Sequence, residues 1–275
     1  MSIGMKTGFK DNILLILSVY RTLLRLPRTV ILRIIINPVD ITRYAEFICL
    51  LKFMSKEKLQ QLNILDVSSP FIMSYILSMF NKVTKSDVNI AEKVFIAESS
   101  SLNFANENAL SLSFDDMSFD LVYSISVVEH IYQDYLHAIN EMIRVTKERG
   151  FVYLTFPVSR EHTEEWLDEN IYSNQYKRSD MTFFQYRFDE EDVDGIFNNM
   201  RGVEIISREI FWERKNGEYD RAVAKLKHKC NNRYLDIIKD AILNIYYGFT
   251  LLDREPHDFS KSRSFGNMFI ILRKI

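Results

Sequence analysis

The sequence predicts an α/β fold: a mostly parallel sheet with helices on both faces, an antiparallel last strand, and a helical extension at the N-terminus. The first observation is the alternation, over residues 60–160, of short apolar runs with segments of helical periodicity, which is typical of parallel strands joined by crossover helices. The second is a pair of later apolar runs, residues 203–212 and 267–273, which we expect to form antiparallel strands at the sheet edge. The third is an N-terminal segment, residues 12–36, whose apolar helical pattern is interrupted by arginines and by Pro27.

Composition narrows the possible function classes. The chain of 275 residues has a net charge of −2, so no overall field marks it as a binder of polyanions. Its two cysteines, Cys49 and Cys230, fit neither a disulfide framework nor a paired zinc motif, and the five histidines are scattered, so we expect no metal site. No glycine lies between Gly8 and Gly150, which excludes the P-loop and the GxGxxG dinucleotide fingerprint from the first half.

Residues 1–44 are predicted to form a basic, amphipathic helical extension. Arg21, Arg25 and Arg28 follow one another at helical spacing and form one stripe. The longest uncharged run, residues 12–20, is shorter than the ~20 residues that span a bilayer, and arginines inside and after the apolar run fit a signal peptide poorly. We therefore expect a cytoplasmic protein. Two alternatives stay open for the extension: a helical lid packed on the domain, or an interfacial helix on the anionic inner face of the membrane.

The alternating region begins with a strand and a very tight turn. Residues 62–67 form a short apolar strand, and residues 71–80 have the character of a helix. Between them, Ser69 is a favourable N-cap and Pro70 a favourable first helical residue. The strand is therefore expected to pass into the helix almost directly.

The next segments continue the alternation. Residues 82–87 are predicted as a second strand that ends in Asp87, at the place where a carboxylate usually grips a ribose diol. Residues 119–125 form another strand, and the apolar spacing that follows it predicts a helix that ends at Gly150. Residues 151–156 form the next buried strand. These strands supply the parallel part of the sheet.

The same region contains three motif segments in order. They are Asn108-Ala109-x-x-Leu112-Ser113-Phe114-x-Asp116-x-Ser118-Phe119-Asp120-x-Val122, then Val128-Glu129-His130-Ile131, then Glu141-x-x-Arg144-Val145-x-Lys147-x-x-Gly150. Their combination and spacing resemble the class I S-adenosylmethionine (SAM)-dependent methyltransferases, and more narrowly the methyltransferase type 11-like subfamily. The resemblance extends over roughly residues 60–160. It implies a Rossmann-like, seven-stranded sheet in a domain of residues 45–275, with a helical insertion at about residues 214–264.

The resemblance also implies where SAM and the acceptor bind. The implied cofactor-binding residues are Asp66, Val67, Ser68, Ser69, Asp87, Asn108, Ser124 and Ser126, and the implied catalytic residues, which face the methyl-transfer cavity, are Glu129 and His130. In this assignment the residues after the first strand replace the family's glycine-rich SAM loop, Asp87 takes the ribose hydroxyls, and Asn108 lies near adenine. The two serines form the floor of the cofactor cleft, at the carboxyl end of their strand.

These residue types also have simpler interpretations. Asp66 suits a turn cap, Asp87 a solvated turn, and His130 a buried ring with a backbone partner. The loop departs from the family pattern because no glycine follows Asp66, and each Cβ there limits the approach of backbone to a ligand. Two functions stay open. One is methyl transfer from SAM to a small-molecule, sugar- or lipid-linked acceptor, with His130 as candidate base, and the other is a non-catalytic binding or scaffold protein that has lost SAM binding.

The second half contributes an acidic, aromatic segment and a basic one. Residues 158–194 contain eleven acidic and four basic residues, and the resemblance places them in a lid over the acceptor; an ordinary helical cap is the alternative. Their aromatic residues are Trp166, Tyr172, Tyr176, Phe183, Phe184, Tyr186 and Phe188. Residues 221–233 contain five basic and no acidic residues, which suits a phosphate-bearing acceptor or an anionic membrane, or simply a solvated face. Nucleic acid is disfavoured because no aromatic residues are interleaved there and the overall charge is negative.

Overall fold

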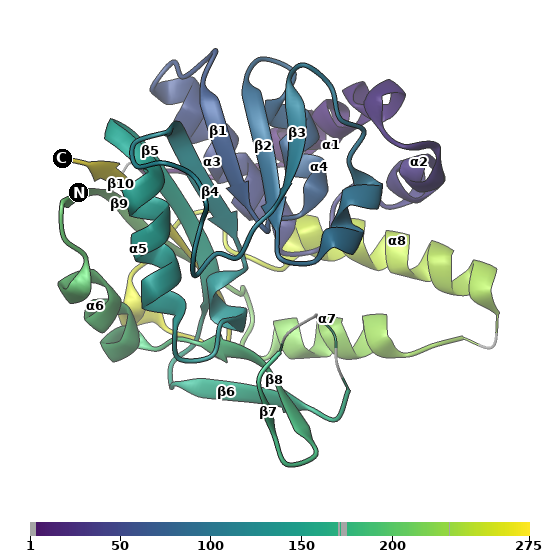
Figure 1. Ribbon diagram of the computed structural model, residues 1–275. Helices are drawn as coiled ribbons and strands as arrows, with labels where there is room; N and C mark the ends of the chain where they lie inside the picture. Colours follow the sequence, from purple (N-terminus) through teal and green to yellow (C-terminus); the bar gives the residue numbers. More distant parts are fainter. Residues whose placement is uncertain (1–3, 170, 172–174, 231) are drawn as a thin grey trace.

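The main sheet has seven strands in the spatial order β3-β2-β1-β4-β5-β10-β9 (Figure 1). The computed structural model describes residues 4–169, 171, 175–230 and 232–275. The strands are Asn63–Val67 (β1), Lys82–Asp87 (β2), Leu102–Asn106 (β3), Phe119–Ile125 (β4), Thr146–Val158 (β5), Val203–Trp212 (β9) and Gly266–Lys274 (β10).

The strand directions place a switch point beside β1. Strand β1 pairs in parallel with β2 and with β4, β2 pairs in parallel with β3, and β4 with β5. Strand β10 lies between β5 and β9 and is antiparallel to both. The α/β class, the seven-stranded sheet and the antiparallel last strands are confirmed. In open sheets of this type, ligands bind at the carboxyl ends of the strands next to the switch point.

Alternate strand residues are buried on opposite faces of the sheet. Ile64 and Leu121 belong to the hydrophobic cluster on one face, and their neighbours Leu65 and Val122 belong to the cluster on the other. The first face is covered by α1 (Phe9–Arg21), α2 (Arg28–Ile36), α3 (Arg43–Lys56) and α4 (Phe71–Leu77), and the second by α5 (Tyr135–Val145) and α6 (Glu190–Asn199). The N-terminal helices therefore share a core with the sheet.

A small second sheet follows β5. Its strands β6 (Thr163–Leu167), β8 (Met181–Arg187) and β7 (Lys177–Arg178) pair antiparallel in the order β6-β8-β7. The segment expected as a lid is thus a β-structure that leads into α6. Helix α6 begins with a capping box in which Asp189 and Asp192 each accept a hydrogen bond from the other's backbone N–H at 3.0 Å.

The insertion between β9 and β10 forms two helices. Helices α7 (Glu218–Lys227) and α8 (Arg233–Thr250) lie side by side and extend away from the body of the molecule (Figure 1). Short 3-10 helices complete the described chain: η1 (Leu23–Arg25), η2 (Ile90–Phe95), η3 (Val128–His130) and η4 (Phe259–Lys261). Within the described residues, we find no helix with the length and apolar character required to cross a membrane.

The predicted role of Gly150 is wrong. Helix α5 ends at Val145 and β5 begins at Thr146, so Gly150 lies within a strand and not at a helix end. A Cβ at this position would lie 2.9 Å from the carbonyl oxygens of Asp120 and Lys147. The glycine therefore permits close approach of two strands.

The predicted N-cap at Ser69 is also wrong, and one strand lies outside the sequence predictions. Pro70 occupies the N-cap position of α4, and the Ser69 hydroxyl accepts a hydrogen bond from the Ile125 backbone N–H at 2.9 Å. Strand β3 is a partly exposed edge strand, so its sequence Leu-Asn-Phe-Ala-Asn lacks the apolar run that marks the central strands.

Candidate cofactor and acceptor site

Asp66, near the end of β1, is fully buried and is bound through both carboxylate oxygens. Its Oδ1 accepts a hydrogen bond from the Ser69 backbone N–H at 2.9 Å, and its Oδ2 accepts from the Tyr123 hydroxyl at 2.7 Å and from the Ser74 hydroxyl. Burial raises the pKa of Asp66, against the opposing effects of Lys85 and of these hydrogen bonds. The side chain thus connects β1, α4 and β4 at the carboxyl ends of the strands.

A buried lysine lies between the two carboxylates that were predicted to bind the cofactor. Lys85 on β2 is 1% exposed, and its Nζ lies 3.7 Å from Asp66 Oδ1 and 3.7 Å from Asp87 Oδ2. The same Nζ donates to the Ser86 carbonyl at 3.3 Å. The sequence analysis did not predict a role for Lys85. The signal was available, because a lysine two residues before Asp87 in a strand points to the same face of the sheet as that carboxylate.

The turn after β1 has a glycine-type backbone without a glycine. Ser68 has a φ of 55°, in the left-handed region that costs an L-residue roughly 1–2 kcal/mol. Its backbone N–H donates to the Ser86 carbonyl at 2.9 Å, which ties the turn to β2. Val67 and Ser69 are buried, whereas Ser68 and Pro70 are partly exposed.

Asp87 ends β2 with a partly accessible carboxylate. Its side chain is 14% exposed, and its Oδ1 accepts a hydrogen bond from the Asn89 backbone N–H at 2.9 Å, while Oδ2 faces Lys85. The next residue, Val88, is 40% exposed. A carboxylate and an accessible apolar side chain are therefore adjacent at this edge.

Asn108 follows β3 on the same side of the sheet. Its side chain is exposed, and its Oδ1 accepts a hydrogen bond from the Leu110 backbone N–H at 3.0 Å. The backbone N–H of Glu107 donates to the Asp87 carbonyl at 3.1 Å, so the ends of β2 and β3 remain joined here. The amide of Asn108 stabilises a local turn near the predicted adenine position.

The two predicted serines of β4 differ in accessibility. Ser124 is buried, and its hydroxyl donates to the Val67 carbonyl at 3.2 Å, so it connects β4 to β1. Ser126 is partly exposed and has a φ of 50°, a second left-handed residue at this edge. Its hydroxyl donates to Glu46 Oε1 at 2.6 Å. Non-glycine residues with a left-handed backbone conformation are strained, and such residues cluster at functional sites.

Helix α3 brings a buried ion pair to the carboxyl ends of β4 and β5. Glu46 is fully buried; its Oε1 also accepts from the Thr155 hydroxyl at 2.8 Å, and its Oε2 lies 2.6 Å from Arg43 Nη1. Burial lowers the pKa of Arg43, but the pairing with Glu46 more than offsets this, so the pKa lies above its ordinary value. Sequence reasoning missed both residues; the available signal was a glutamate inside a long apolar helix.

Glu129 is the second buried carboxyl group of this cluster. It lies in η3, is 1% exposed, and among the described residues its Oε2 has no hydrogen-bond partner. Burial raises the pKa of Glu129 to about 8, in spite of the opposing effects of Arg43 and Ser126. The side chain therefore keeps its proton at neutral pH and has an oxygen to offer to a ligand.

His130 contacts both Glu129 and the lid. Its Nδ1 lies 2.5 Å from the Phe184 carbonyl oxygen, and its Nε2 lies 3.9 Å from Glu129 Oε1. Because a carbonyl only accepts, we assign the proton to Nδ1, which leaves the Nε2 lone pair as an acceptor. Burial lowers the pKa of His130 to about 4, so the ring is neutral at physiological pH.

The aromatic residues of the lid pack together over η3. Tyr132, just after His130, stacks on Tyr176 with ring centroids 4.2 Å apart and meets Phe183 edge-on at 4.9 Å. The lid is thereby attached to the segment that bears the two predicted catalytic residues. Tyr172 lies outside the described residues.

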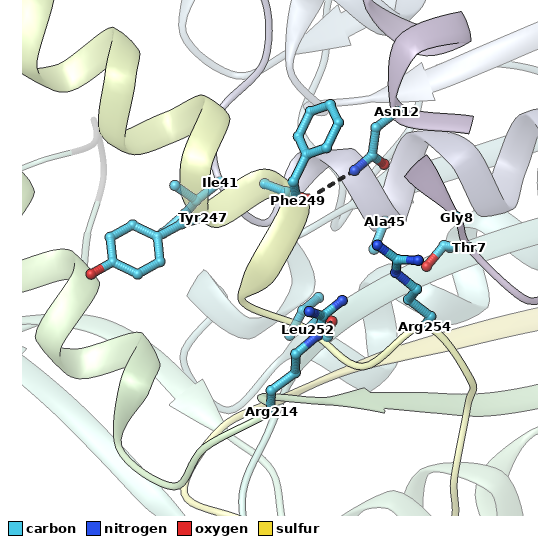
Figure 2. Close-up of a pocket in the computed structure, with 11 residues that line it drawn as sticks. Thr7, Gly8, Asn12, Ile41, Ala45, Arg214, Tyr247, Phe249, Leu252 and Arg254 are labelled. Carbon is cyan, nitrogen blue, oxygen red and sulfur yellow. Dashed lines mark hydrogen bonds between the residues drawn. The ribbon is translucent and has the colours of Figure 1, made fainter. Parts of the chain in front are cut away.

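Two hollows lie away from this edge. A crevice of about 20 Å³ separates the N-terminal segment from the end of α8, where Asn12 Nδ2 donates to the Gly248 carbonyl at 3.3 Å (Figure 2). It has room for about one water molecule. A wider hollow of about 650 Å³ is lined in part by Asn63, Lys82 and Asp120, at the amino ends of their strands. Ligands of open α/β sheets bind at the carboxyl ends of the strands, which is where Asp87 and Ser126 lie.

A family comparison finds a match in the central part of the chain. Residues 72–154 match the family model described as a methyltransferase domain. The match begins just after the glycine-free turn of residues 66–70, where the sequence departs from the glycine-rich pattern. No curated protein sequence matches this chain.

Solved structures show the fold of this chain. The structure of coclaurine N-methyltransferase bound to N-methylheliamine and SAH aligns with a TM-score of 0.54 at 12% identity, over 98% of this chain and 89% of that one. The cyclase SpnF aligns with a TM-score of 0.53 at 17% identity, over 82% and 80%, and the MccD protein with 0.50 at 14%, over 82% and 95%. These likenesses show that the chain has a Rossmann-like methyltransferase fold. Since one neighbour is named a cyclase, fold alone does not specify the reaction.

The described residues contain no group of three or more histidine, cysteine, aspartate or glutamate side chains placed to hold a metal ion. The charged cluster of Arg43, Glu46 and Glu129 is balanced internally by one ion pair and one protonated carboxyl group. The carboxyl ends of the strands also offer hydrogen-bonding groups, a neutral imidazole and aromatic side chains.

Proposed function

We propose that this protein transfers a methyl group from SAM to a small-molecule, sugar- or lipid-linked acceptor. The observation that supports this most is the backbone of Ser68, which adopts the left-handed conformation that a glycine would supply in the turn after β1. This turn lies at the carboxyl edge beside the switch point, where open sheets of this type bind ligands.

The residues at this edge fit SAM. Asp87 would accept hydrogen bonds from the ribose hydroxyls, Val88 would cover a face of adenine, and Asn108 would lie at the adenine edge. Asp66, Val67, Ser69 and Ser124 are buried and would act by holding the turn and the strand ends in place. When bound, SAM supplies an electrophilic methyl group on a sulfonium sulfur.

We propose that the acceptor lies beside Ser126, Glu129 and His130. A protonated Glu129 would donate a hydrogen bond to the acceptor, or accept one through its unpartnered oxygen. His130, oriented by the Phe184 carbonyl, would receive the hydrogen of an acceptor O–H or N–H at Nε2. The aromatic lid would exclude water from the transfer, and the main contribution of the protein would be alignment.

We also propose the domain limits expected from the sequence. Residues 45–275 would form the methyltransferase domain with an insertion at about 214–264, and residues 1–44 would be its extension. Arg43, at the start of α3, links the two parts because it pairs with Glu46 beside the site.

Calorimetric titration of the full chain with SAM and with S-adenosylhomocysteine tests the cofactor proposal. We expect micromolar binding that Asp87→Ala weakens about tenfold or more, because each tenfold loss corresponds to about 1.4 kcal/mol, the scale of a charged hydrogen bond. Asp115→Ala, an exposed aspartate before β4, is the matched control and should leave the affinity unchanged. Folded protein that shows no binding at concentrations that reveal a millimolar constant would contradict the proposal.

One observation favours the non-catalytic alternative, a binding or scaffold protein. The Lys85 ammonium group lies against both Asp66 and Asp87, and such an internal ion cluster can replace a ligand as the partner of the carboxylates. A transfer assay separates the two functions. With SAM labelled in its methyl group and extract fractions of small molecules, glycans and lipids, an enzyme labels one fraction, and His130→Gln lowers the rate without loss of SAM binding.

A further inference from the structure

Helix α8 presents its apolar side to solvent. The residues of this helix that are exposed, among those whose side chains the structure describes, are all aliphatic or aromatic, with exposed fractions from 39% to 77%. They are Tyr234, Leu235, Ile237, Ile238, Ile242, Ile245 and Tyr246. A surface helix of a globular protein normally buries its apolar side and exposes its polar side.

The polar residues of α8 are turned toward the protein. Asp236 accepts a hydrogen bond from the Cys230 backbone N–H at 2.7 Å, and the buried Asn244 accepts one from the Ile41 backbone N–H at 3.2 Å. Lys239 Nζ donates to the Leu226 carbonyl of α7 at 3.4 Å. These contacts fix the rotation of the helix about its axis, so the exposed apolar face is a defined feature of the fold.

The attachment of α8 lies at its carboxyl half. Tyr247 is buried there, and Phe249 meets the ring of Phe9 at 5.1 Å and that of Tyr44 at 5.7 Å. A Cβ at Gly248 would lie 2.3 Å from the Tyr44 ring, so the helix crosses α3 closely. The amino half extends beyond the body of the protein (Figure 1). The apolar face is therefore presented on a rigid arm.

The helices that contact α8 also carry exposed basic and apolar side chains. Helix α8 contacts α1, α2 and α7. The exposed apolar residues of the N-terminal part include Phe9, Ile13, Leu14, Leu17, Leu24 and Leu32, and the exposed basic residues on α1, α2 and α7 are Lys10, Arg21, Arg28, Arg33, Arg221, Lys225 and Lys227. Two acidic residues of these helices are paired: Asp11 with Lys52 at 2.7 Å, and Asp220 with Arg187 at 2.9 Å.

We infer that α8, together with α1 and α2, docks this protein on an anionic lipid bilayer. Apolar side chains on a rigid helix enter the headgroup region, and the flanking arginines and lysines bind lipid phosphates. A second copy of the chain is disfavoured as the occupant, because a symmetric contact would bring the same basic side chains of two copies together. The helix would lie in the membrane plane. The inference does not rest on the proposed methyl transfer, since docking needs no SAM.

Vesicle flotation of the full chain tests this inference. We expect binding to vesicles of phosphatidylcholine with phosphatidylglycerol, and much weaker binding to phosphatidylcholine alone or at high salt. Ile242→Ser should lower the partition coefficient roughly tenfold. Val94→Ser is the matched control, because Val94 on η2 is also 61% exposed and lies outside the docking surface. Arg28→Gln and Arg33→Gln should each weaken binding to the anionic vesicles about fivefold.

Three results would overturn the inference. The first is a chain that stays with the aqueous phase in the presence of anionic vesicles at low salt. The second is an equal loss of binding for Ile242→Ser and Val94→Ser. The third is a dimer in light scattering that Ile242→Ser converts to a monomer, which would assign the face to a second copy.

Discussion

The buried carboxyl group of Glu129 leads to a sharp prediction about pH and stability. Replacement by glutamine keeps the shape of the side chain and removes its ionisation. Burial raises the pKa of Glu129 from 4.5 to about 8 in the folded protein. Below pH 4.5 the group is protonated in both states and costs nothing. Between pH 4.5 and 8 the unfolded chain ionises while the folded protein does not, so the wild type loses stability as the pH rises.

The magnitude follows from this difference in pKa. One pKa unit corresponds to about 1.4 kcal/mol, so the full rise from 4.5 to about 8 amounts to about 5 kcal/mol above pH 8. Glutamine lacks this penalty. The free energy of unfolding of Glu129→Gln, relative to wild type, should therefore increase steadily from pH 5 to pH 8 and then level off.

Guanidinium unfolding at intervals from pH 5 to pH 9 measures this quantity. His130 does not affect the difference between Glu129→Gln and wild type. The lowered pKa of His130 reduces stability as the pH falls from 6.5 toward 4, and it does so in both proteins. Glu57→Gln, an exposed glutamate after α3, serves as the control. A difference between Glu129→Gln and wild type that stays flat across this pH range would refute the argument.

Five further substitutions test the packing of the fold by equilibrium unfolding. Gly266→Ala should destabilise the fold by about 1–3 kcal/mol, because a Cβ there would lie 2.5 Å from an indole carbon of Trp212 on β9. Gly195→Ala should stabilise the fold by about 1 kcal/mol, because Gly195 lies in α6 with open space around its Cβ position. Lys85→Met should cost about 3 kcal/mol by leaving a buried carboxylate unpaired, whereas Lys82→Met on the same strand is exposed and should be nearly neutral. Ser68→Gly should stabilise by about 0.5–1 kcal/mol, since it relieves a left-handed φ.

The sheet was largely predictable because its central strands are short, apolar and separated by turn signals. Strand β2 coincides with the predicted residues 82–87, and β9 with 203–212. The edge strand β3 and the strands of the lid were not predictable in the same way, because a partly exposed strand has no continuous apolar run. The lid strands β6 and β8 instead mix acidic and aromatic residues, which also suits an amphipathic helix.

The candidate site was predictable only in part, because hydrogen-bond partners are distant in sequence. The patterns indicate Asp66 but not Tyr123, its partner 57 residues later. They indicate Ser126 but not Glu46, which lies 80 residues earlier on another element. Motif matching finds residues that follow strands, whereas the groups that orient them come from helices packed across the edge.

The turn after β1 shows how this edge can do without glycine. A glycine there has two effects: it allows a positive φ, and it leaves room for a ligand to reach the backbone. Ser68 provides the first, and Asp66 and Ser69 contribute to the second because their side chains turn inward, toward Tyr123 and Ile125. Of the side chains in this turn, those of Ser68 and Pro70 stay partly exposed, and the residue with the positive φ carries the hydroxymethyl group of Ser68. If that group hinders the cofactor, Ser68→Gly will tighten SAM binding in calorimetry as well as stabilise the fold; a gain in stability at unchanged affinity would show that the ligand meets the backbone elsewhere.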